Sequence, residues 1–141
     1  MGYKANYETD VKSSRQAVFA ALMDFGGIDK LLPEGAITSC VLDGSGVGAV
    51  RTLELGEPSG FPGQVIERLD LAYNEEVFAY SIMGVPSLPI DEYVAVVELS
   101  DNDDGGCHVK WTSNWVPTGG VTEQQMAPQL EGLYGAILDN F

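Results

Sequence analysis

Basic side chains are scarce in this sequence. Its 141 residues include 7 Lys and Arg against 21 Asp and Glu, which gives a formal net charge of −14. A chain with this charge repels phosphate backbones and anionic lipid, so the sequence argues against nucleic-acid binding and against a role at a membrane surface. The charge favours solubility but identifies no partner.

Histidine, cysteine and long apolar runs are also rare. The one histidine, His108, falls on the polar side of a predicted strand, which argues against a metal site or a Ser–His catalytic pair. No apolar run approaches the roughly 20 residues of a transmembrane helix, and residues 1–10 lack the apolar stretch of a secretion signal. We therefore expect a cytoplasmic protein without membrane insertion, in which Cys40 and Cys107 are free thiols.

Two motif-like segments lack the residues that their chemistry requires. The glycines of 44–48, GSGVG, open a predicted strand instead of a helix, so no helix N-terminus faces a phosphate. Residues 101–106, DNDDGG, resemble the start of a calcium loop, but Thr112 stands where a bidentate Glu is required. The sequence predicts neither a bound metal nor a cofactor.

Strand-like alternation dominates the chain. It begins over residues 3–12 and recurs, with turn residues between, over 36–42, 48–55, 63–72, 76–83, 91–99 and 107–116. Most of these segments are closely linked, which predicts an antiparallel meander.

Two helical regions interrupt and end this pattern. A capping box with Ser13 as the N-cap and Gln16 three residues later predicts a helix that stops at Gly26-Gly27, before a short helical piece over 28–32. A second capping box, in 122–125, starts a long C-terminal helix. The order predicts an α+β fold with helices on one face of the sheet, and a sheet curled around a helix can enclose a cavity for small apolar ligands.

The alternation also predicts which polar residues face the interior. Arg51, Glu67, Asp91 and Ser113 share the parity of the apolar residues on their strands. The inward set itself is rich in aromatics and comprises Val65, Leu69, Leu71, Phe78, Tyr80, Ile82, Tyr93, Ala95, Val97, Leu99, Val109, Trp111 and Trp115.

Arg51 and Glu67 lie on consecutive strands and are expected to pair. A buried charge without a partner destabilises a fold by several kcal/mol, roughly, so each needs the other if both are inside. The pair is open to two interpretations, as a structural ion pair or as a contact for the polar end of a ligand. Buried tyrosines such as Tyr80 and Tyr93 also need a partner, which can be a residue, water or a ligand.

The loop Gly84 to Pro89, GVPSLP, is either a rigid hairpin connection or a lid over the cavity mouth. In the C-terminal helix, Gly132 and Gly135 either permit close packing on the sheet or leave room for a ligand.

The whole chain resembles the START-like superfamily, also called SRPBCC or Bet v 1-like, and within it the polyketide cyclase/dehydrase-like group. The resemblance rests on the order of short segments: SSRQAVFAALMDFGGIDKLLP, GVGAVRTLEL, VIERLD, FAYSI, DEYVAVVEL, VKWTSNWVP and the terminal helix. It implies one helix-grip domain over 1–141, with a seven-stranded curved sheet wrapped around the C-terminal helix and two short helices between the first two strands. It also implies that GVPSLPI is a gate-like loop, with Val85, Pro86 and Leu88 as its gate residues.

The resemblance implies binding of a small hydrophobic molecule, since members of the superfamily bind lipids, sterols, hormones and polyketides. The expected ligand-binding residues are Phe78, Tyr80, Tyr93, Trp111, Ser113, Trp115, Leu133 and Ile137. The alternative is a cyclase, dehydratase or lyase without a cofactor, in which Glu67 abstracts a proton and Arg51 or a tyrosine hydroxyl stabilises the oxyanion. A third interpretation is an interaction module whose ligand controls a protein partner through the 84–89 loop. A homodimer stays open as an alternative to a monomer.

Overall fold

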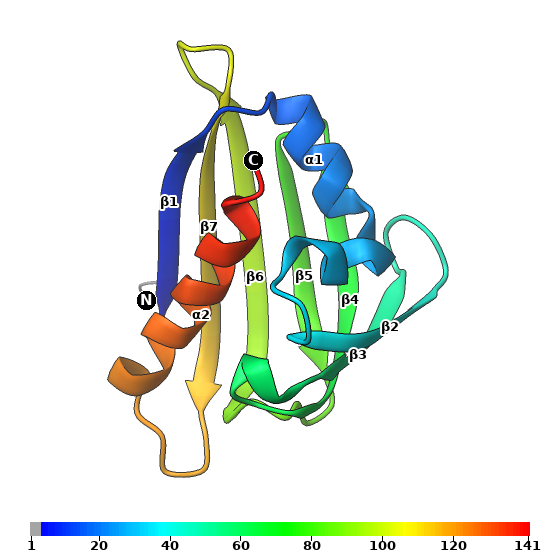
Figure 1. Cartoon of the computed structure of the whole chain (residues 1–141), viewed down its shortest axis with the longest axis vertical. Helices are drawn as coiled ribbons and strands as arrows, with labels where there is room; N and C mark the ends of the chain where they lie inside the picture. Colours follow the sequence, from blue (N-terminus) through cyan, green and yellow to red (C-terminus); the bar gives the residue numbers. More distant parts are fainter. Residues whose placement is uncertain (1–3) are drawn as a thin grey trace.

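A computed structural model describes residues 4–141 of the chain as one curved antiparallel sheet with helices on its concave side (Figure 1). The strands stand in the order β1-β7-β6-β5-β4-β3-β2, so every neighbour except the β1–β7 pair is also a neighbour in sequence. Their bounds are β1 (Ala5–Val11), β2 (Ile37–Asp43), β3 (Val50–Leu55), β4 (Gly63–Tyr73), β5 (Val77–Met83), β6 (Ile90–Asp101) and β7 (Cys107–Pro117). The predicted α+β helix-grip fold with seven strands is confirmed. The first predicted strand began at Tyr3, which lies outside the described residues.

Two helical elements connect β1 to β2, as predicted, but their boundaries differ from the prediction. Helix α1 (Arg15–Met23) begins after Ser14, whose hydroxyl accepts a hydrogen bond from the Ala17 backbone N–H at 3.2 Å. The N-cap is therefore Ser14 and not Ser13, because Ser14 has the extended backbone of a cap residue. The 3₁₀ helix η1 (Phe25–Leu31) then runs through the two glycines that were expected to separate the helices.

Helix α2 (Glu123–Leu138) crosses the concave face of the sheet (Figure 1). Its predicted capping box is present, since the Thr122 hydroxyl accepts from the Gln125 N–H at 3.2 Å and the Gln125 side chain accepts from the Thr122 N–H at 2.9 Å. Gly135 permits a close approach to β1, because a Cβ there would lie 3.2 Å from the Tyr7 ring. At the other glycine of the helix, Gly132, a Cβ would meet open space.

Hydrogen bonds tie α2 and the residues after it to other elements. The Glu131 carboxylate, in the middle of the helix, accepts from the Asn6 backbone N–H of β1 at 3.0 Å, and the Asn140 amide, just after the helix, donates to the Leu31 carbonyl of η1 at 2.7 Å. These contacts hold the helix against β1 and η1. None of the helices within residues 4–141 has the length and apolar character needed to cross a membrane.

The alternation predicted correctly which strand residues face inward, except where the register between two strands shifts. Leu71 was expected inside but is 46% exposed, because the β4–β5 register shifts between Leu69 and Leu71. Asp91 was expected on the inner surface, at the cavity mouth, but is exposed, because the β6–β7 register shifts between Asp91 and Val94. Glu92, within that shift, has a left-handed backbone with φ of 55°. An inserted residue of this kind turns the following side chains to the opposite face.

Candidate functional site

A cavity of about 270 Å³ lies between the concave face of the sheet and α2. Every helix and strand other than β1 and α1 contributes side chains to its wall, and most of these side chains are apolar. The apolar wall includes Leu53, Val65 and Ile82 from the strands and Met126, Leu130 and Ile137 from α2. A twisted sheet curves away from a straight helix, so the space between them is widest where the strands bend around it.

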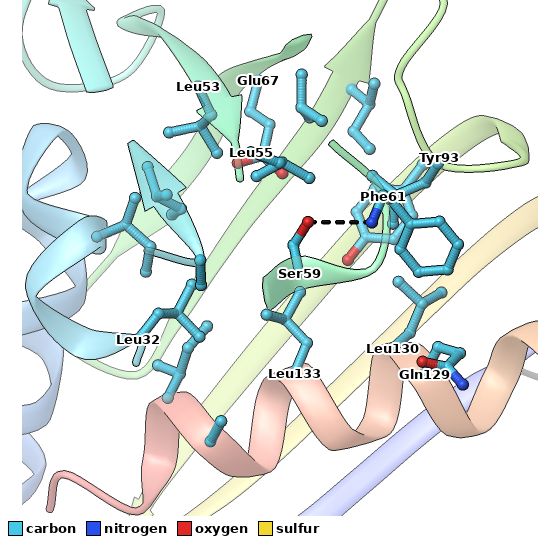
Figure 2. Close-up of a pocket in the computed structure, with 18 of the residues that line it drawn as sticks. Leu32, Leu53, Leu55, Ser59, Phe61, Glu67, Tyr93, Gln129, Leu130 and Leu133 are labelled. Atoms are coloured by element: carbon cyan, nitrogen blue, oxygen red, sulfur yellow. Dashed lines mark hydrogen bonds between the residues drawn. The ribbon is translucent and has the colours of Figure 1, made fainter. Parts of the chain in front are cut away.

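The short 3₁₀ helix η2 (Glu57–Ser59) and the residues after it face α2 across this space. Figure 2 shows Ser59 and Phe61 on one side and Leu130 and Leu133 on the other. The Ser59 hydroxyl donates to the Gly56 carbonyl at 2.6 Å and accepts from the Phe61 N–H at 3.1 Å, which holds the segment in a tight turn. Leu133 is 37% exposed although it lines the cavity, so the opening lies beside it.

Arg51 and Glu67 form the predicted ion pair on the cavity wall. They are direct cross-strand partners on β3 and β4, and the Arg51 Nε and Nη2 atoms both lie 2.8 Å from Glu67 Oε1. Arg51 Nη1 donates to the Phe25 carbonyl at 3.0 Å, and the guanidinium carbon lies 3.7 Å from the centre of the Phe25 ring. The two side chains are only 6% and 11% exposed, so the expectation that both face inward is confirmed.

A chain of hydroxyl groups continues from this pair across the site. The Tyr80 and Tyr93 hydroxyl oxygens lie 3.1 Å apart, and those of Tyr93 and Tyr134 lie 2.5 Å apart. Tyr134, on α2, donates in turn to the Ser113 hydroxyl of β7 at 2.8 Å. Burial raises the pKa of all three tyrosines, so the chain consists of neutral hydroxyls. The carboxylate of Glu67 raises the pKa of Tyr80 further.

Tyr134 was not among the expected site residues. It lies on the buried face of α2, where it follows Met126 and Leu130 at helical spacing. That same spacing points its hydroxyl at the strands, and a buried phenol on a helix that faces a sheet needs a partner there. The partner, Ser113, was predicted as an inward polar residue, and this part of the expectation is confirmed.

The predicted ligand-binding residues divide into two groups in the structure. The cavity wall contains Arg51, Glu67, Tyr80, Tyr93, Trp111, Leu133 and Ile137. Phe78, Ser113 and Trp115 are buried but do not line it, and they pack in the core instead. The indole nitrogens of Trp111 and Trp115 are sealed inside the protein and have no hydrogen-bond partner within residues 4–141.

The three predicted gate residues have different positions. Leu88 lines the cavity, Pro86 is buried, and Val85 is 94% exposed. The loop also supports the η2 segment, because the Ser87 hydroxyl donates to the Phe61 carbonyl at 2.8 Å. Its action as a gate stays a prediction.

Sequence reasoning missed the part of the wall that irregular segments supply. Leu32, Ala36, Pro58 and Phe61 line the cavity, and the predicted strands and helices assigned none of them to it. Phe61 carried the clearest signal, since it is a large aromatic residue in a segment otherwise made of glycine, proline and polar residues.

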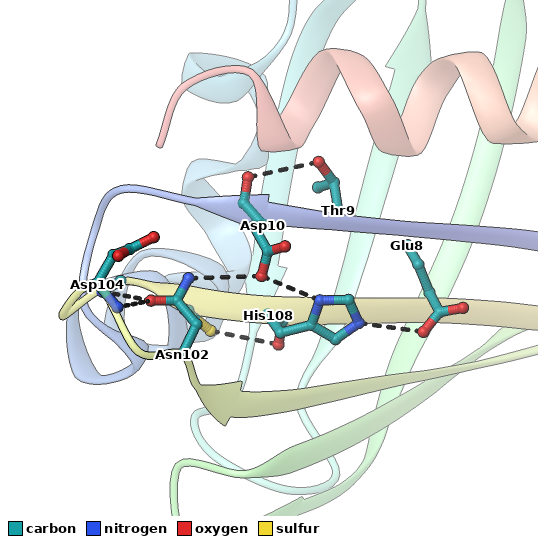
Figure 3. Close-up of polar contacts among 8 residues, drawn as sticks. Glu8, Thr9, Asp10, Asn102, Asp104 and His108 are labelled. Atoms are coloured by element: carbon teal, nitrogen blue, oxygen red, sulfur yellow. Dashed lines mark hydrogen bonds and ion pairs between the residues drawn. The ribbon is translucent and has the colours of Figure 1, made fainter.

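His108 lies outside this site. It faces outward from β7 and lies between Glu8 and Asp10 of β1, with one ring nitrogen 3.1 Å from each carboxylate (Figure 3). These two hydrogen bonds raise its pKa. The described residues contain no group of three or more His, Cys, Asp or Glu side chains that could hold a metal ion.

Comparison with known proteins places the chain. The family model for polyketide cyclase / dehydrase and lipid transport matches residues 3–141. No curated protein sequence matches. Among solved structures, an uncharacterised protein from Bacillus thuringiensis has a TM-score of 0.76 at 22% identity, over 97% of each chain. The protein XoxI from Bacillus cereus has a TM-score of 0.75 at 23% identity, over 97% of this chain and 95% of its own.

A protein from Nitrosospira multiformis has a TM-score of 0.71 at 22% identity, over 97% of this chain and 94% of its own. Identities this low show a shared fold and nothing further about function. The family match, however, extends over nearly the whole chain, and the resemblance described above is confirmed. The chain belongs to the polyketide cyclase/dehydrase and lipid transport family.

Proposed function

We propose that this protein binds one small, mostly apolar molecule, of aromatic, polyketide or lipid-like character, in the cavity between the sheet and α2. The observation that carries this proposal is an apolar cavity with a compact group of polar side chains on one wall. Binding pockets are typically apolar with a few well-placed polar groups that orient the ligand. The family to which the chain belongs also includes lipid transport in its description. We place this activity in the cytoplasm.

Arg51, Glu67, Tyr80 and Tyr93 form this group, here called the polar wall. The Arg51 guanidinium carbon lies 5.6 Å from the centre of the Tyr80 ring, so the ion pair and the hydroxyl chain are adjacent. Their position supports a ligand whose polar end meets the polar wall and whose apolar body contacts Leu130, Leu133 and the β-strand side chains. The cavity of about 270 Å³ is close to the small end of ligand pockets, which favours one compact molecule.

The proposal is tested by isothermal titration calorimetry with a panel of phenols, polyketide-like aromatics, sterols and fatty acids. A variant that fills the cavity, Ala136→Phe, is expected to weaken binding by at least about tenfold, which corresponds to ~1.4 kcal/mol. The matched control is Ala20→Phe, the same change at an exposed position of α1. Equal affinity of both variants and the unmodified protein would place the ligand outside the cavity and refute the proposal.

A second candidate function is acid–base catalysis at Glu67. Its Oε1 atom accepts from the Arg51 Nε–H and lies 2.8 Å from Arg51 Nη2. The observation that favours this candidate is the position of the carboxylate, which is 11% exposed and lines a mostly apolar cavity. A carboxylate in such a cavity is a suitable general base for a cyclisation or dehydration.

Glu67→Gln separates this candidate from binding alone. If Glu67 is the base, turnover of a polyketide-like substrate is expected to vanish while the ligand still binds. The control is Asp70→Asn, which alters a carboxylate of the same strand that does not line the cavity. Unchanged turnover in Glu67→Gln would exclude Glu67 as the base.

A further inference from the structure

The hydroxyl chain has a direction, and this direction determines which hydrogen bonds the cavity can offer. In the bond between Tyr134 and Ser113, Tyr134 is the donor. A tyrosine hydroxyl has one proton, so Tyr134 must accept in its bond with Tyr93, and Tyr93 must then accept in its bond with Tyr80. The protons therefore run from Tyr80 through Tyr93 and Tyr134 to Ser113.

This direction leaves Tyr80 and Tyr93 without a proton for a ligand. Both residues line the cavity, but each hydroxyl already donates along the chain. The Tyr80 oxygen accepts nothing from the chain, and the Tyr93 oxygen has one lone pair left after it accepts from Tyr80. Towards the cavity, both groups act as acceptors.

The other polar side chains of the cavity differ in the protons they have left. Each of the three nitrogens of Arg51 has an acceptor, on Glu67 or on the Phe25 carbonyl, but a guanidinium has five N–H protons, so two of them are left for other acceptors. The Ser59 hydroxyl donates to Gly56, and the indole N–H of Trp111 is sealed away from the cavity. Glu67 is an acceptor when ionised. Gln129, which is exposed at the opening, also has an amide proton that no contact in residues 4–141 uses. Arg51 and Gln129 therefore keep donors, whereas Tyr80 and Tyr93 offer the cavity acceptor oxygens.

We propose that Tyr80 and Tyr93 accept a hydrogen bond from the ligand, so that the polar wall favours a compound with a phenol, enol or alcohol hydroxyl over its ether isomer, which cannot donate. This inference rests on the proposed function and specifies the class of its ligand. A hydroxyl that donates to Tyr80 becomes the first member of the chain, and each following bond is strengthened by the one before it. Because Tyr80 and Tyr93 have no proton left for the cavity, they cannot donate to the oxyanion that develops in acid–base catalysis at Glu67 unless the hydroxyl chain reverses.

The test uses four naphthalenes that carry one substituent at the same ring position: hydroxymethyl, methoxy, acetyl or methyl. The hydroxymethyl and methoxy compounds are isomers, so they differ in donor capacity and not in atomic composition. By calorimetry, the hydroxymethyl compound is expected to bind about tenfold more tightly than its methoxy isomer, as one hydrogen bond to a buried acceptor would produce. The acetyl compound measures what a carbonyl gains from the two remaining N–H protons of Arg51. The methyl compound measures the binding of the apolar body alone.

Variants at the far end of the chain test its direction without changing the cavity wall. Ser113→Ala removes the final acceptor, and Tyr134→Phe removes a link, while neither residue lines the cavity. Either change frees a proton to turn back towards the cavity, so the preference for the hydroxymethyl over the methoxy compound is expected to fall several-fold. Tyr73→Phe, which removes the hydroxyl of a 64% exposed tyrosine, is the control and keeps the preference.

The outcomes separate this inference from the proposed function. If the methoxy compound binds as tightly as the hydroxymethyl compound, or more tightly, the cavity binds ligands but the inference is wrong. If Ser113→Ala and Tyr134→Phe fold normally and keep the full preference, the direction of the chain does not determine selectivity. If none of the four binds, including the methyl compound, the proposed function itself is contradicted for compact aromatics and the inference fails with it.

Discussion

The strongest prediction concerns the ion pair of Arg51 and Glu67. We expect each single replacement, Arg51→Met or Glu67→Leu, to lower the free energy of unfolding by about 3–5 kcal/mol. The double variant is expected to lie within about 1 kcal/mol of the unmodified protein or to exceed its stability. The reason is that one charge left alone in the interior is far more unfavourable than an apolar pair that packs in the same space.

The magnitude follows from the environment of the two side chains. They are 6% and 11% exposed, and the two closest contacts between them are 2.8 Å, so solvent screens them little. Arg51→Met also removes the hydrogen bond to the Phe25 carbonyl and the contact between the guanidinium and the Phe25 ring. Those two losses contribute roughly 1 kcal/mol each.

The assay is urea unfolding of the four proteins, followed by tryptophan fluorescence, with the coupling energy taken from the double-mutant cycle. Arg68→Met is the control, because Arg68 pairs with Asp70 at 2.7 Å on the exposed side of the sheet, and a loss below about 1 kcal/mol is expected there. Single variants that each lose less than about 1 kcal/mol would refute the reasoning. They would show that water in the cavity solvates the pair.

Three further predictions concern other parts of the molecule. Hydrogen bonds to Glu8 and Asp10 raise the pKa of His108 above the ordinary 6.5. The protonated His108 therefore adds stability, at most about 1 kcal/mol, which is fully present below pH 6.5 and is lost as the pH rises through the pKa of the folded state. Thermal melts of His108→Gln should therefore differ from the parent at pH below 6.5 and coincide in alkali. Gly132→Ala is expected to stabilise α2 by up to about 1 kcal/mol, and Gly135→Ala by less, because only at Gly135 would the new methyl group contact a neighbouring ring, that of Tyr7. Chemical denaturation measures the free energy of unfolding of both variants. Burial raises the pKa of both thiols, and Cys107 is inaccessible, so a thiol reagent should label Cys40 slowly and Cys107 only on unfolding; equal rates in the native state would contradict this.

Alternation in the sequence was sufficient to predict the sheet and its inner face. Arg51 and Glu67 could be paired because their strands are consecutive and regular, so parity places both on the same side. Parity failed at Leu71 and Asp91, where the register of a strand shifts. A bulge depends on how neighbouring strands twist against each other, and one strand's sequence does not contain that information.

Cavity residues that lie in connecting segments were less predictable than those that lie on strands. Tyr80, Tyr93 and Trp111 lie on strands, so their direction could be read from a period of two. Phe61 lies in a connection without a period, and its position depends on tertiary contacts such as the bond from the Ser87 hydroxyl to its carbonyl. Ala36 opened a predicted strand, but β2 begins only at Ile37. The pairing of Tyr134 with Ser113 joins a helix to a strand, so no local pattern could predict it.

The pairing of β1 with β7 has a consequence for the order in which the chain can fold. His108 and Asp10, in contact across these strands, are separated by 98 residues, whereas β2 to β7 pair with their neighbours in sequence. During synthesis β1 leaves the ribosome first but has no partner until β7 has emerged, so it remains an unpaired edge for most of that time. An unpaired edge can pair with another chain, and charged residues protect against this. Glu8, Asp10 and Lys12, on the outward face of β1 and just after it, supply such charges during the interval.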